Sequence, residues 1–328
     1  MHDIGWGILG CGDIAHTFTA SLNALDRGCL VAGASRTPGR AAAFAERYGL
    51  AHGYSDYESL LNDPEVDAVY VATTHNFHFE NVKLCLEHGK HVLCEKPFTV
   101  NAEQARTLMA LAGEKDLFVM EALWTRFLPA IQKLQELIGE GAIGEVTGVY
   151  ANFCLGLDLP PEHRMRNIDL AGGALLDLGI YPISMADIVF GRRPDRISSY
   201  ATLDAVTGVD EYSCYVLEYG SRGKAVLSAS YSQSAPIEAV VSGTGGHIRV
   251  LHFLGAKELH VHRSEGEPEV LQFPYGENEN FKYEIAHAMD CIEAGRRESP
   301  AMPLAKTLEI MELMDTLRKP WGLVYPGE

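Results

Sequence analysis

A glycine-rich turn close to the start of the chain constrains the fold more than any other segment. The residues Gly10-Cys11-Gly12-Asp13-Ile14-Ala15 follow a short apolar segment and open a stretch with helical periodicity. A strand, a tight glycine turn and a helix in this order are typical of the phosphate-binding turn of dinucleotide-binding folds. In such a turn Gly10 permits the bend, Gly12 lets the backbone approach a pyrophosphate, and Ala15 lets the helix pack close to the sheet.

A dinucleotide at this turn would use the free N–H groups and the positive dipole end of the helix. The position between a strand and a helix disfavours the alternative, a glycine-rich turn without a ligand. We therefore predict cofactor contacts from Gly10, Cys11, Gly12, Asp13 and Ile14.

The first 120 residues alternate strand and helix patterns without hairpin turns between them. Strands are predicted at residues 4–9, 29–35, 67–73, 91–94 and 117–120, and helices at residues 14–25, 41–48, 57–61, 79–87 and 101–112. Strands joined by helices indicate right-handed βαβ units and a parallel sheet covered on both faces. The fold class is therefore α/β, with an N-terminal Rossmann doubly wound parallel sheet.

The second part of the chain has a different pattern. Helices are predicted at residues 129–138, 175–190, 283–293 and 304–317, and strands at residues 146–153, 197–203, 212–219, 225–232, 239–250 and 258–261. Short turns such as Tyr219-Gly-Ser-Arg-Gly223 link these strands as hairpins, which predicts a C-terminal α+β domain with an open, mainly antiparallel sheet. We expect residues 1–122 to bind a dinucleotide, and residues 123–328 to bind substrate and form a dimer.

The composition excludes several classes of protein. Lys plus Arg is 27 and Asp plus Glu is 44, which gives a net charge of −17 and disfavours binding to nucleic acid or an anionic membrane. The seven Cys include no C-x-x-C pair, as in a reduced protein without a structural zinc site. No apolar segment is expected to approach membrane-spanning length, and no signal-like segment is recognised, so the expected location is the cytoplasm.

The cofactor subtype depends on the end of the second predicted strand. An acidic residue there would bind a ribose 2′-hydroxyl, but this chain has Ser35-Arg36-Thr37. Arg36 could pair with a 2′-phosphate, and Ser35 and Thr37 could add hydrogen bonds. The alternative is a solvated arginine on a surface turn. We predict NADP, with NAD as the less favoured cofactor.

Glu95-Lys96-Pro97 follows the strand at residues 91–94, at the sheet edge where α/β folds bind ligands. A lysine there can point into a crevice between domains, although a surface lysine is the simpler interpretation of this segment alone. Together with the glycine turn, the segment resembles the Gfo/Idh/MocA oxidoreductases, which are two-domain NAD(P) enzymes of sugars and polyols. The resemblance extends to Met120–Phe127, Gly172–Tyr181, Val241–Gly246 and Glu298–Leu304, and thus over nearly the whole chain.

The resemblance is strongest to the branch that oxidises trans-dihydrodiols and aldopyranoses such as D-xylose with NADP. Many members of the family have His four residues after Asp177, whereas this chain and that branch have Tyr181. The resemblance implies that Tyr181 is the general base, that the ammonium of Lys96 lowers its pKa, and that Asp177 orients Lys96 or a sugar hydroxyl. A core tyrosine would be the favoured interpretation of Tyr181 without the family pattern.

The resemblance also implies further contacts. Cofactor contacts are expected from Thr73, Thr74, His75, Asn76, His78, Glu95, Lys96 and Pro97, and substrate contacts from Trp124, Arg126 and Arg164. Interface packing for Trp124 and a surface salt bridge for Arg164 are the alternatives. His75 and His78 have no partners at ligand spacing, so no metal site is predicted.

Three functions follow as hypotheses. The first is an NADP-dependent dehydrogenase of aldopyranoses or trans-dihydrodiols, working as a homodimer that packs sheet to sheet. The second is a keto-sugar reductase that uses the same residues in reverse. The third is a non-catalytic NADP-sensing protein, which retention of Lys96 and Tyr181 disfavours.

Overall fold

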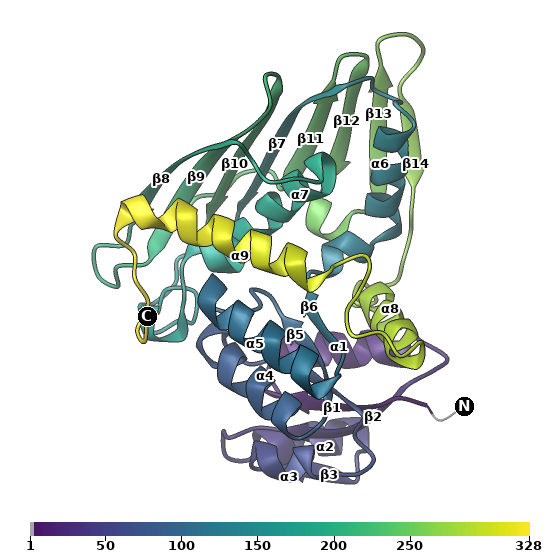
Figure 1. Ribbon diagram of the computed structural model, residues 1–328, viewed down its shortest axis with the longest axis vertical. Coiled ribbons are helices and arrows are strands. Elements are labelled where there is room, and N and C mark those ends of the chain that lie inside the picture. Colours follow the sequence, from purple (N-terminus) through teal and green to yellow (C-terminus); the bar gives the residue numbers. More distant parts are fainter. Residues whose placement is uncertain (1–2) are drawn as a thin grey trace. The chain divides into compact units, whose positions relative to one another are not determined.

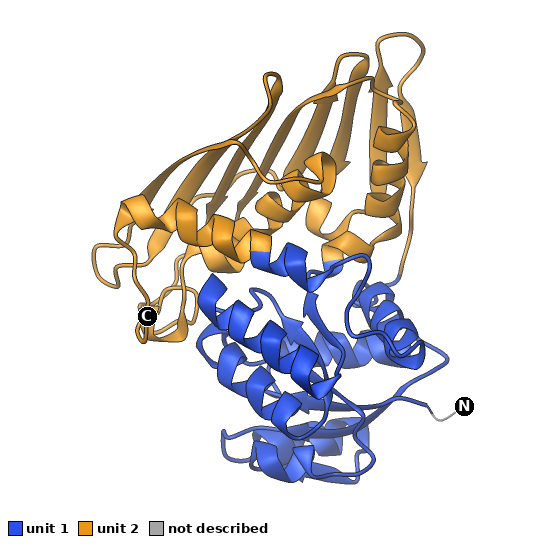
Figure 2. Ribbon diagram, viewed as in Figure 1, with its two compact units in different colours: residues 1–124, 276–308 blue, residues 125–275, 309–328 orange. Residues whose placement is uncertain are grey.

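The computed structural model describes residues 3–328, which form two compact units (Figure 2). Unit 1 comprises the chain up to Trp124 together with Gly276–Leu308, and unit 2 comprises Thr125–Tyr275 and Glu309–Glu328. The expected division placed the whole of residues 123–328 in the second domain. The structure differs because the segment after Tyr275 returns to unit 1.

The returning segment packs on the first helix of unit 1. Helix α8 (Lys282–Glu293) contacts helix α1 (Asp13–Asn23), and Arg27 Nη2 lies 2.5 Å from Asp290 Oδ1. The hydroxyl of Ser21 also donates to the carbonyl of Asn278 at 2.6 Å. A helix pattern in the sequence does not indicate which sheet the helix covers, so the boundary could not be predicted.

Unit 1 contains a six-stranded sheet in the order β3-β2-β1-β4-β5-β6, with every strand pair parallel. Its strands are β1 (Gly5–Leu9), β2 (Cys29–Ala34), β3 (His52–Tyr54), β4 (Ala68–Val71), β5 (His91–Glu95) and β6 (Val119–Ala122). The strand order reverses between β1 and β4. Ligands of doubly wound sheets bind at this switch point, beyond the carboxyl ends of the strands.

Right-handed crossovers run in opposite directions from β1 and from β4, so the helices cover opposite faces of the sheet. The remaining helices of this region are α2 (Arg40–Tyr48), α3 (Tyr57–Leu61), α4 (His78–Glu87) and α5 (Ala102–Lys115). Figure 1 shows α4 and α5 side by side, and the two helices are in contact. Helix α5 begins where Asn101 accepts a hydrogen bond from the Gln104 N–H at 3.0 Å, as its capping sequence predicts.

Unit 2 contains an eight-stranded sheet in the order β14-β13-β12-β11-β7-β10-β9-β8. Its strands are β7 (Val146–Cys154), β8 (Arg196–Leu203), β9 (Asp210–Tyr219), β10 (Gly223–Ser230), β11 (Glu238–Gly243), β12 (Gly246–Leu251), β13 (Glu258–Arg263) and β14 (Glu269–Gln272). Only the β7–β10 pair is parallel. Helices α6 (Pro129–Gly139) and α7 (Ile180–Phe190) pack on one face of this sheet, and α9 (Leu304–Arg318) ends in unit 2 (Figure 1).

The strand predictions in unit 2 contained one error and one omission. The segment predicted as one strand at residues 239–250 is the hairpin β11–β12, with Thr244 and Gly245 in its turn. Gly246 has a φ of +150°, which favours glycine, and so permits this turn within an otherwise apolar run. Strand β14 was not predicted because it is short, mostly exposed and at the sheet edge.

Among residues 3–328, the segment Ile168–Phe190 is long and apolar enough to span a membrane. The expectation that the chain contains no such segment was therefore wrong. Of its most apolar 18-residue window, 89% is buried inside the structure. A helix that is apolar all round is also what the core of a large domain requires.

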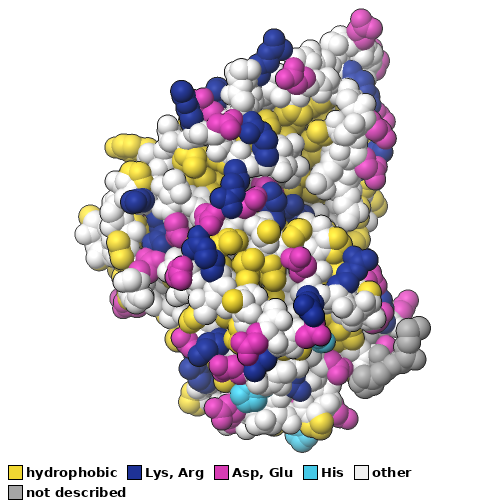
Figure 3. All heavy atoms as spheres, in the orientation of Figure 1, with side chains coloured by type: hydrophobic (Ala, Val, Ile, Leu, Met, Phe, Trp, Pro, Cys, Tyr) yellow, Lys and Arg dark blue, Asp and Glu magenta, His cyan; other side chains and the backbone are white. Residues whose placement is uncertain are grey.

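The visible face of the molecule carries mixed charge. Figure 3 shows Lys and Arg side chains interspersed with Asp and Glu side chains, without a continuous patch of either sign on this face. The net charge of −17 is thus not concentrated into one acidic patch on the face shown.

Candidate active site

The glycine turn lies between β1 and α1 at the switch point. Gly10 has a φ of +97°, and a Cβ there would lie 2.8 Å from the carbonyl oxygen of Ala72 on the neighbouring chain segment. Gly12 has an ordinary φ of −94°, and a Cβ there would meet nothing within 4 Å. The protein itself therefore requires glycine at position 10 but gives no packing reason for glycine at position 12.

The open space at Gly12 fits a dinucleotide pyrophosphate. Gly12 is the N-cap of α1 and, as a glycine, has no side chain that could accept a hydrogen bond from the first N–H groups of the helix. A pyrophosphate would satisfy these donors, which belong to the start of α1 around Asp13 and Ile14. The Cys11 side chain points inward, where burial raises its pKa to about 11, so only its backbone could serve a ligand.

Arg36 follows β2 and is held between two aromatic rings. Its guanidinium carbon lies 4.9 Å from the centroid of Tyr57 and 4.8 Å from that of Phe77. The buried Ser35 hydroxyl accepts a hydrogen bond from the Thr37 N–H at 3.2 Å, which shapes the loop. Stacking on two rings orders an arginine before any ligand arrives, and leaves its N–H edge for two oxygens of an anion such as a phosphate. Sequence analysis did not identify Tyr57 or Phe77.

The segment after β4 holds the next group of predicted cofactor contacts. The Thr73 hydroxyl accepts from Asn81 Nδ2 at 3.0 Å, and the Thr74 hydroxyl donates to Asn76 Oδ1 at 2.7 Å. Thr73, Thr74 and Asn76 are half-buried, whereas His75 is buried. The half-buried residues therefore remain accessible at the carboxyl end of β4.

The cofactor contact of His78 stays a prediction, and the structure shows that its side chain bonds within the protein. Its side chain is fully buried, Nδ1 lies 2.8 Å from the carbonyl of Pro97, and Nε2 lies 3.0 Å from the carbonyl of Thr73. Burial lowers the pKa of His78 to about 4, so it is neutral near pH 7. His78 connects the loop after β4 to the loop after β5.

The Glu95-Lys96-Pro97 segment lies at the end of β5 and is fixed by buried carboxylates. The Tyr70 hydroxyl donates to one oxygen of Glu95, and the Lys96 backbone N–H donates to the other at 3.2 Å. One residue beyond the cis Lys96–Pro97 peptide bond, the Phe98 N–H donates to Glu121 at 2.9 Å. The half-buried Lys96 side chain therefore extends from a well-anchored loop at the carboxyl edge of the sheet.

A third carboxyl in unit 1 was missed by the sequence analysis. Glu284 on α8 is fully buried, and neither of its oxygens has a hydrogen-bond partner. Burial, followed by the charge of Glu95, raises the pKa of Glu284 well above its usual value. An isolated glutamate in an amphipathic helix pattern looks like a solvated residue, so the sequence gave no indication of this burial.

In unit 2 the structure places two of the three predicted catalytic residues, Asp177 and Tyr181, around one helix. A π-helical turn, Leu175–Gly179, precedes α7 and contains Asp177, and Tyr181 follows in the first turn of α7. Arg164 Nη1 lies 2.8 Å from Asp177 Oδ2, and the Arg164 side chain is half exposed. The Tyr181 side chain is 6% exposed and packs edge-to-face on Phe153, with ring centroids 5.7 Å apart.

The substrate contact of Arg126 stays a prediction, and the structure pairs its side chain with another protein group. The side chain is buried, and its Nη2 lies 2.5 Å from Asp187 Oδ2 on α7. A buried ion pair of this kind fixes a segment to a helix and has little freedom to meet a ligand. Trp124, in unit 1, is 9% exposed and packs on Phe281 at 5.3 Å between ring centroids, and its substrate contact stays a prediction.

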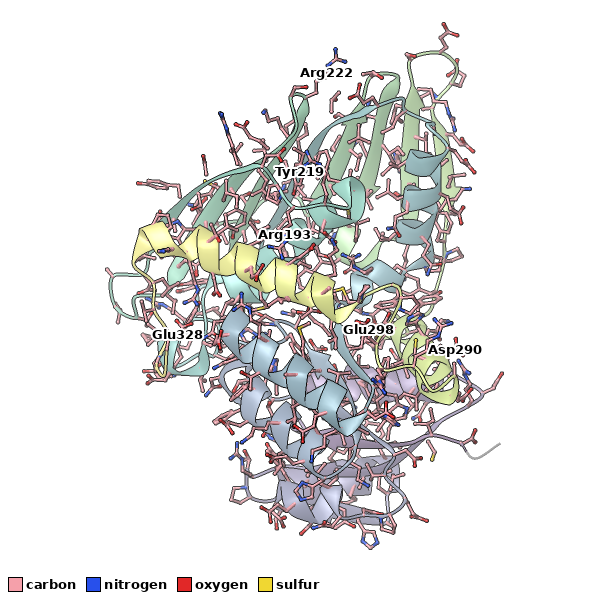
Figure 4. The ribbon with its side chains drawn as sticks, in the orientation of Figure 1. Arg193, Tyr219, Arg222, Asp290, Glu298 and Glu328 are labelled. Carbon is pink, nitrogen blue, oxygen red and sulfur yellow. The ribbon has the colours of Figure 1, made fainter. Side chains whose placement is uncertain are left out.

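Unit 2 also contains a crevice of about 180 Å³. It is formed by α7, β8, β9 and α9, and its wall includes Asp187, the partner of Arg126. Figure 4 labels Arg193 and Tyr219 on the same wall. Its charged residues pair with protein groups: Arg193 lies 2.6 Å from Glu312, and Asp187 pairs with Arg126. No predicted site residue lines this crevice, so we do not assign the chemistry to it.

Comparison with known proteins agrees with this geometry. A family profile described as an oxidoreductase family with an NAD-binding Rossmann fold matches residues 4–123, and the GFO/IDH/MocA C-terminal domain profile matches residues 131–249. The chain is 38% identical to trans-1,2-dihydrobenzene-1,2-diol dehydrogenase of Mus musculus over 334 aligned residues, covering 98% of each chain.

Solved structures show the same architecture. A 3-ketoreductase from Actinomadura kijaniata in complex with NADP and TDP-benzene has a TM-score of 0.86 and 28% identity, covering 96% of this chain and 97% of that one. A levoglucosan dehydrogenase in complex with NADH and levoglucosan has a TM-score of 0.86 at 20% identity, covering 96% of each chain, and supports the fold alone.

These findings confirm the predicted fold class and the prediction that the protein is an enzyme. The parallel sheet, the mainly antiparallel sheet and both family profiles agree, and together the profiles match more than half of the chain. The chain belongs to the Gfo/Idh/MocA family of NAD(P)-binding oxidoreductases.

Proposed function

We propose that this oxidoreductase transfers hydride between NADP and a hydroxyl-bearing carbon of a sugar or cyclic diol. An aldopyranose such as D-xylose and a trans-dihydrodiol are the preferred substrates. The observation that carries the proposal is the helix of unit 2 that presents Tyr181 one turn after Asp177, whose carboxylate is held by Arg164 at 2.8 Å. The relation to a dihydrodiol dehydrogenase over 98% of the chain supports the substrate class.

The proposed chemistry is a coupled loss of a proton and a hydride. When bound, NADP⁺ supplies the hydride acceptor. Tyr181, as phenolate, takes the proton of the substrate hydroxyl, and in the reducing direction its phenol returns that proton. A free phenol has a pKa of about 10, so an ammonium such as that of Lys96 is needed to favour the phenolate near neutral pH. Asp177, paired with Arg164, is proposed to orient the polar groups of the substrate.

The test is a panel of aldoses, inositols and cyclic diols with NADP⁺ or NAD⁺, followed at the nicotinamide absorbance. Tyr181→Phe should lower kcat by about 10²- to 10⁴-fold. Lys96→Met should lower kcat similarly and move the acid limb of the oxidation profile to higher pH, because the phenolate loses its neighbouring ammonium. Tyr48→Phe and Lys83→Met, which alter surface helices of unit 1, are the matched controls. A Tyr181→Phe variant that keeps most of its kcat would refute the proposed base.

The preference for NADP is supported by the arrangement of Arg36. A guanidinium already stacked between Tyr57 and Phe77 could accept a 2′-phosphate with little further loss of side-chain freedom. Arg36→Ala should weaken NADP⁺ binding at least tenfold and leave NAD⁺ binding nearly unchanged, as measured by fluorescence titration of the reduced cofactors. Equal losses for both cofactors would contradict the proposed 2′-phosphate contact.

We also propose that a second copy of the chain covers the open face of the unit 2 sheet. A row of directly paired residues crosses four neighbouring strands on this face: Val216, Val226, Tyr150 and Val240. Val216, Val226 and Tyr150 are 39%, 44% and 52% exposed, and such an apolar row favours burial against another apolar surface. A homodimer with isologous sheet packing would bury it.

The dimer is tested by sedimentation. Val226→Lys should shift the protein from dimer to monomer in analytical ultracentrifugation, because it places a charge in the centre of the row. Val206→Lys is the control, since Val206 is 72% exposed in a turn outside the row. A wild-type protein that sediments as a monomer would leave the sheet face solvated.

A keto-sugar reductase is the second candidate, favoured by similarity to a solved 3-ketoreductase at 28% identity. It uses the same residues, with Tyr181 as the acid. Turnover of keto-sugars with NADPH, without turnover of the aldoses and diols, would favour it. Binding of NADPH without turnover of any substrate in the panel would indicate a sensor.

A further inference from the structure

Asp210 is a buried carboxyl that meets the first residue of the π turn. It lies at the start of β9 and is fully buried. Its Oδ2 accepts the Leu175 N–H at 2.7 Å and the Ser213 hydroxyl at 2.8 Å. Gly173 has a φ of +114°, and a Cβ there would lie 2.3 Å from Asp210 Oδ1, so the chain before the turn is closely fitted to this carboxyl.

The same network reaches the other end of the π turn. The hydroxyls of Ser213 and Tyr215 lie 2.7 Å apart, and a Cβ on Gly179 would lie 2.5 Å from the Tyr215 hydroxyl oxygen. Leu175 and Gly179 are the first and last residues of the turn. Asp210 therefore bonds to its start, and Tyr215 packs against its end. Asp177 lies in the middle of this turn, and Tyr181 follows two residues after its end.

The groups that face Asp210 come from three segments. They are the Leu175 N–H, the hydroxyls of Ser213 and Tyr215 on β9, and the Tyr325 phenol near the C-terminus, which donates to the Gly172 carbonyl at 2.8 Å. Arg318 and Glu328 lie beyond Tyr325 and pair with each other.

Burial raises the pKa of Asp210 to about 7, while the hydrogen bonds from Ser213 and Leu175 act in the opposite direction. Burial also holds the pKa of both phenols well above their usual value, so they are neutral when Asp210 titrates. The two hydrogen-bond donors that stabilise the ionised carboxylate therefore belong to the same network that supports the turn.

We propose that Asp210 is a positioning residue that caps the π turn and thereby holds Asp177 and Tyr181 in their active arrangement. The inference rests on the proposed function of Tyr181. An ionised carboxylate accepts the Leu175 N–H strongly and suits the positive end of the helix, whereas a protonated one accepts it weakly. Activity should therefore fall as Asp210 gains a proton.

The kinetic test compares wild type with Asp210→Asn. Measured in the reducing direction, where Tyr181 acts as the acid and limits activity only at high pH, the wild-type kcat profile should show an acid limb near pH 7. Asp210→Asn should lack this limb, because the amide does not titrate. At pH 8 the variant should have about tenfold lower kcat with little change in KM, since a neutral acceptor replaces a charged one. A folded Asp210→Asn enzyme with an unchanged acid limb would overturn the proposal.

Two further variants keep the test decisive. Ser213→Ala removes one donor to the carboxylate and should move the acid limb to higher pH, so it tests the inference even where Asp210→Asn does not fold. Asp204→Asn is the matched control, because Asp204 pairs with Arg166 at 2.5 Å and bonds to Val206, Thr207 and Tyr231, which lie outside the π turn. Asp204→Asn should lower the stability of the protein without moving the acid limb of the kcat profile.

A measurement without turnover separates this inference from the proposed function. Hydrogen exchange of residues 175–179, corrected for its intrinsic pH dependence, should become faster in the wild type as the pH falls through about 7 and stay constant in Asp210→Asn. Full activity of Tyr181→Phe would refute the proposed function whatever the exchange shows. Unchanged exchange in the wild type would refute the role of Asp210 alone.

Discussion

The two units prepare their predicted halves of the active site by different physical means. In unit 1 the main elements are backbone shapes: the tight turn at Gly10, the open helix end at Gly12 and the anchored loop at Lys96. In unit 2 they are buried ionisable side chains inside the core, namely Asp177 beside Arg164 and Asp210 beneath the π turn.

The difference follows from what each half has to recognise. A pyrophosphate carries charge on many oxygens, and backbone N–H groups at a helix end can meet it without any specific side chain. A hydroxyl that must lose its proton needs one group with the appropriate pKa in a fixed position. A site built from backbone N–H groups is sensitive to substitution of its glycines. The activity of a site built from ionisable side chains is sensitive to pH.

The sharpest test of the backbone half is the contrast between its two glycines. Gly10→Ala should destabilise the protein by about 4 kcal/mol, because it combines a positive φ with a contact of 2.8 Å to the Ala72 carbonyl. Gly12→Ala should leave the melting temperature unchanged but weaken dinucleotide binding about tenfold or more, since the methyl group would occupy the pyrophosphate space. Calorimetry and fluorescence titration measure the two effects. A large loss of stability in Gly12→Ala would contradict the conclusion that the space at Gly12 is open for a pyrophosphate.

The pH dependence of buried ion pairs in unit 2 is tested at Asp204, which lies outside the proposed active site and is buried beside Arg166. Hydrogen bonds from Arg166 and from the Val206 and Thr207 N–H groups hold its pKa well below its usual value. Its contribution to the free energy of unfolding is present above pH 4 and is lost as the pH falls through the folded pKa. Asp204→Asn should cost about 3 kcal/mol at pH 7 and progressively less below pH 4 in urea titrations. If the difference in the free energy of unfolding between wild type and Asp204→Asn did not change with pH, the charge of Asp204 would not contribute to stability.

Glu284 could weaken the comparison, because unit 1 also contains buried carboxyls and neither oxygen of this one has a hydrogen-bond partner. Its raised folded pKa means that its stabilising contribution is complete below about pH 4 and is lost as the pH rises. Glu284→Gln should therefore stabilise the protein by about 2 kcal/mol at pH 8 and have little effect at pH 4, as measured by thermal unfolding. The exposed Glu80→Gln is the control. Destabilisation at pH 8 would mean that the ionised form of Glu284 is needed.

The smallest expected effect concerns the aromatic support of Arg36. Phe77→Leu removes one of the two rings and should weaken NADP⁺ binding about threefold, with no effect on NAD⁺ binding. Tyr48→Leu, which removes the ring beneath Arg47, is the control at a comparable surface pair. Weaker binding of both NADP⁺ and NAD⁺ would indicate that Phe77 contacts a part of the cofactor that the two dinucleotides share.

The elements that carry local signals were predictable from the sequence. The glycine turn, the Asn101 cap and the alternation of strands and helices indicated the Rossmann sheet, and hairpin turns indicated the second sheet. The roles of His78 and Arg126 were not predictable, because each depends on a partner distant in the sequence, Pro97 and Asp187. Asp210 and Glu284 were missed for the same reason: burial of a lone carboxyl is a tertiary property.

The return of Gly276–Leu308 to unit 1 affects how the protein must be synthesised. On the ribosome, α1 is made long before α8, which carries the buried Ile285, Ala288 and Met289. The nucleotide half therefore completes its packing only after nearly the entire polypeptide has emerged. A fragment cut after Trp124 would leave the α8-facing side of α1 without its covering helix, so isolated expression of this half requires residues 276–308 to be joined back to it.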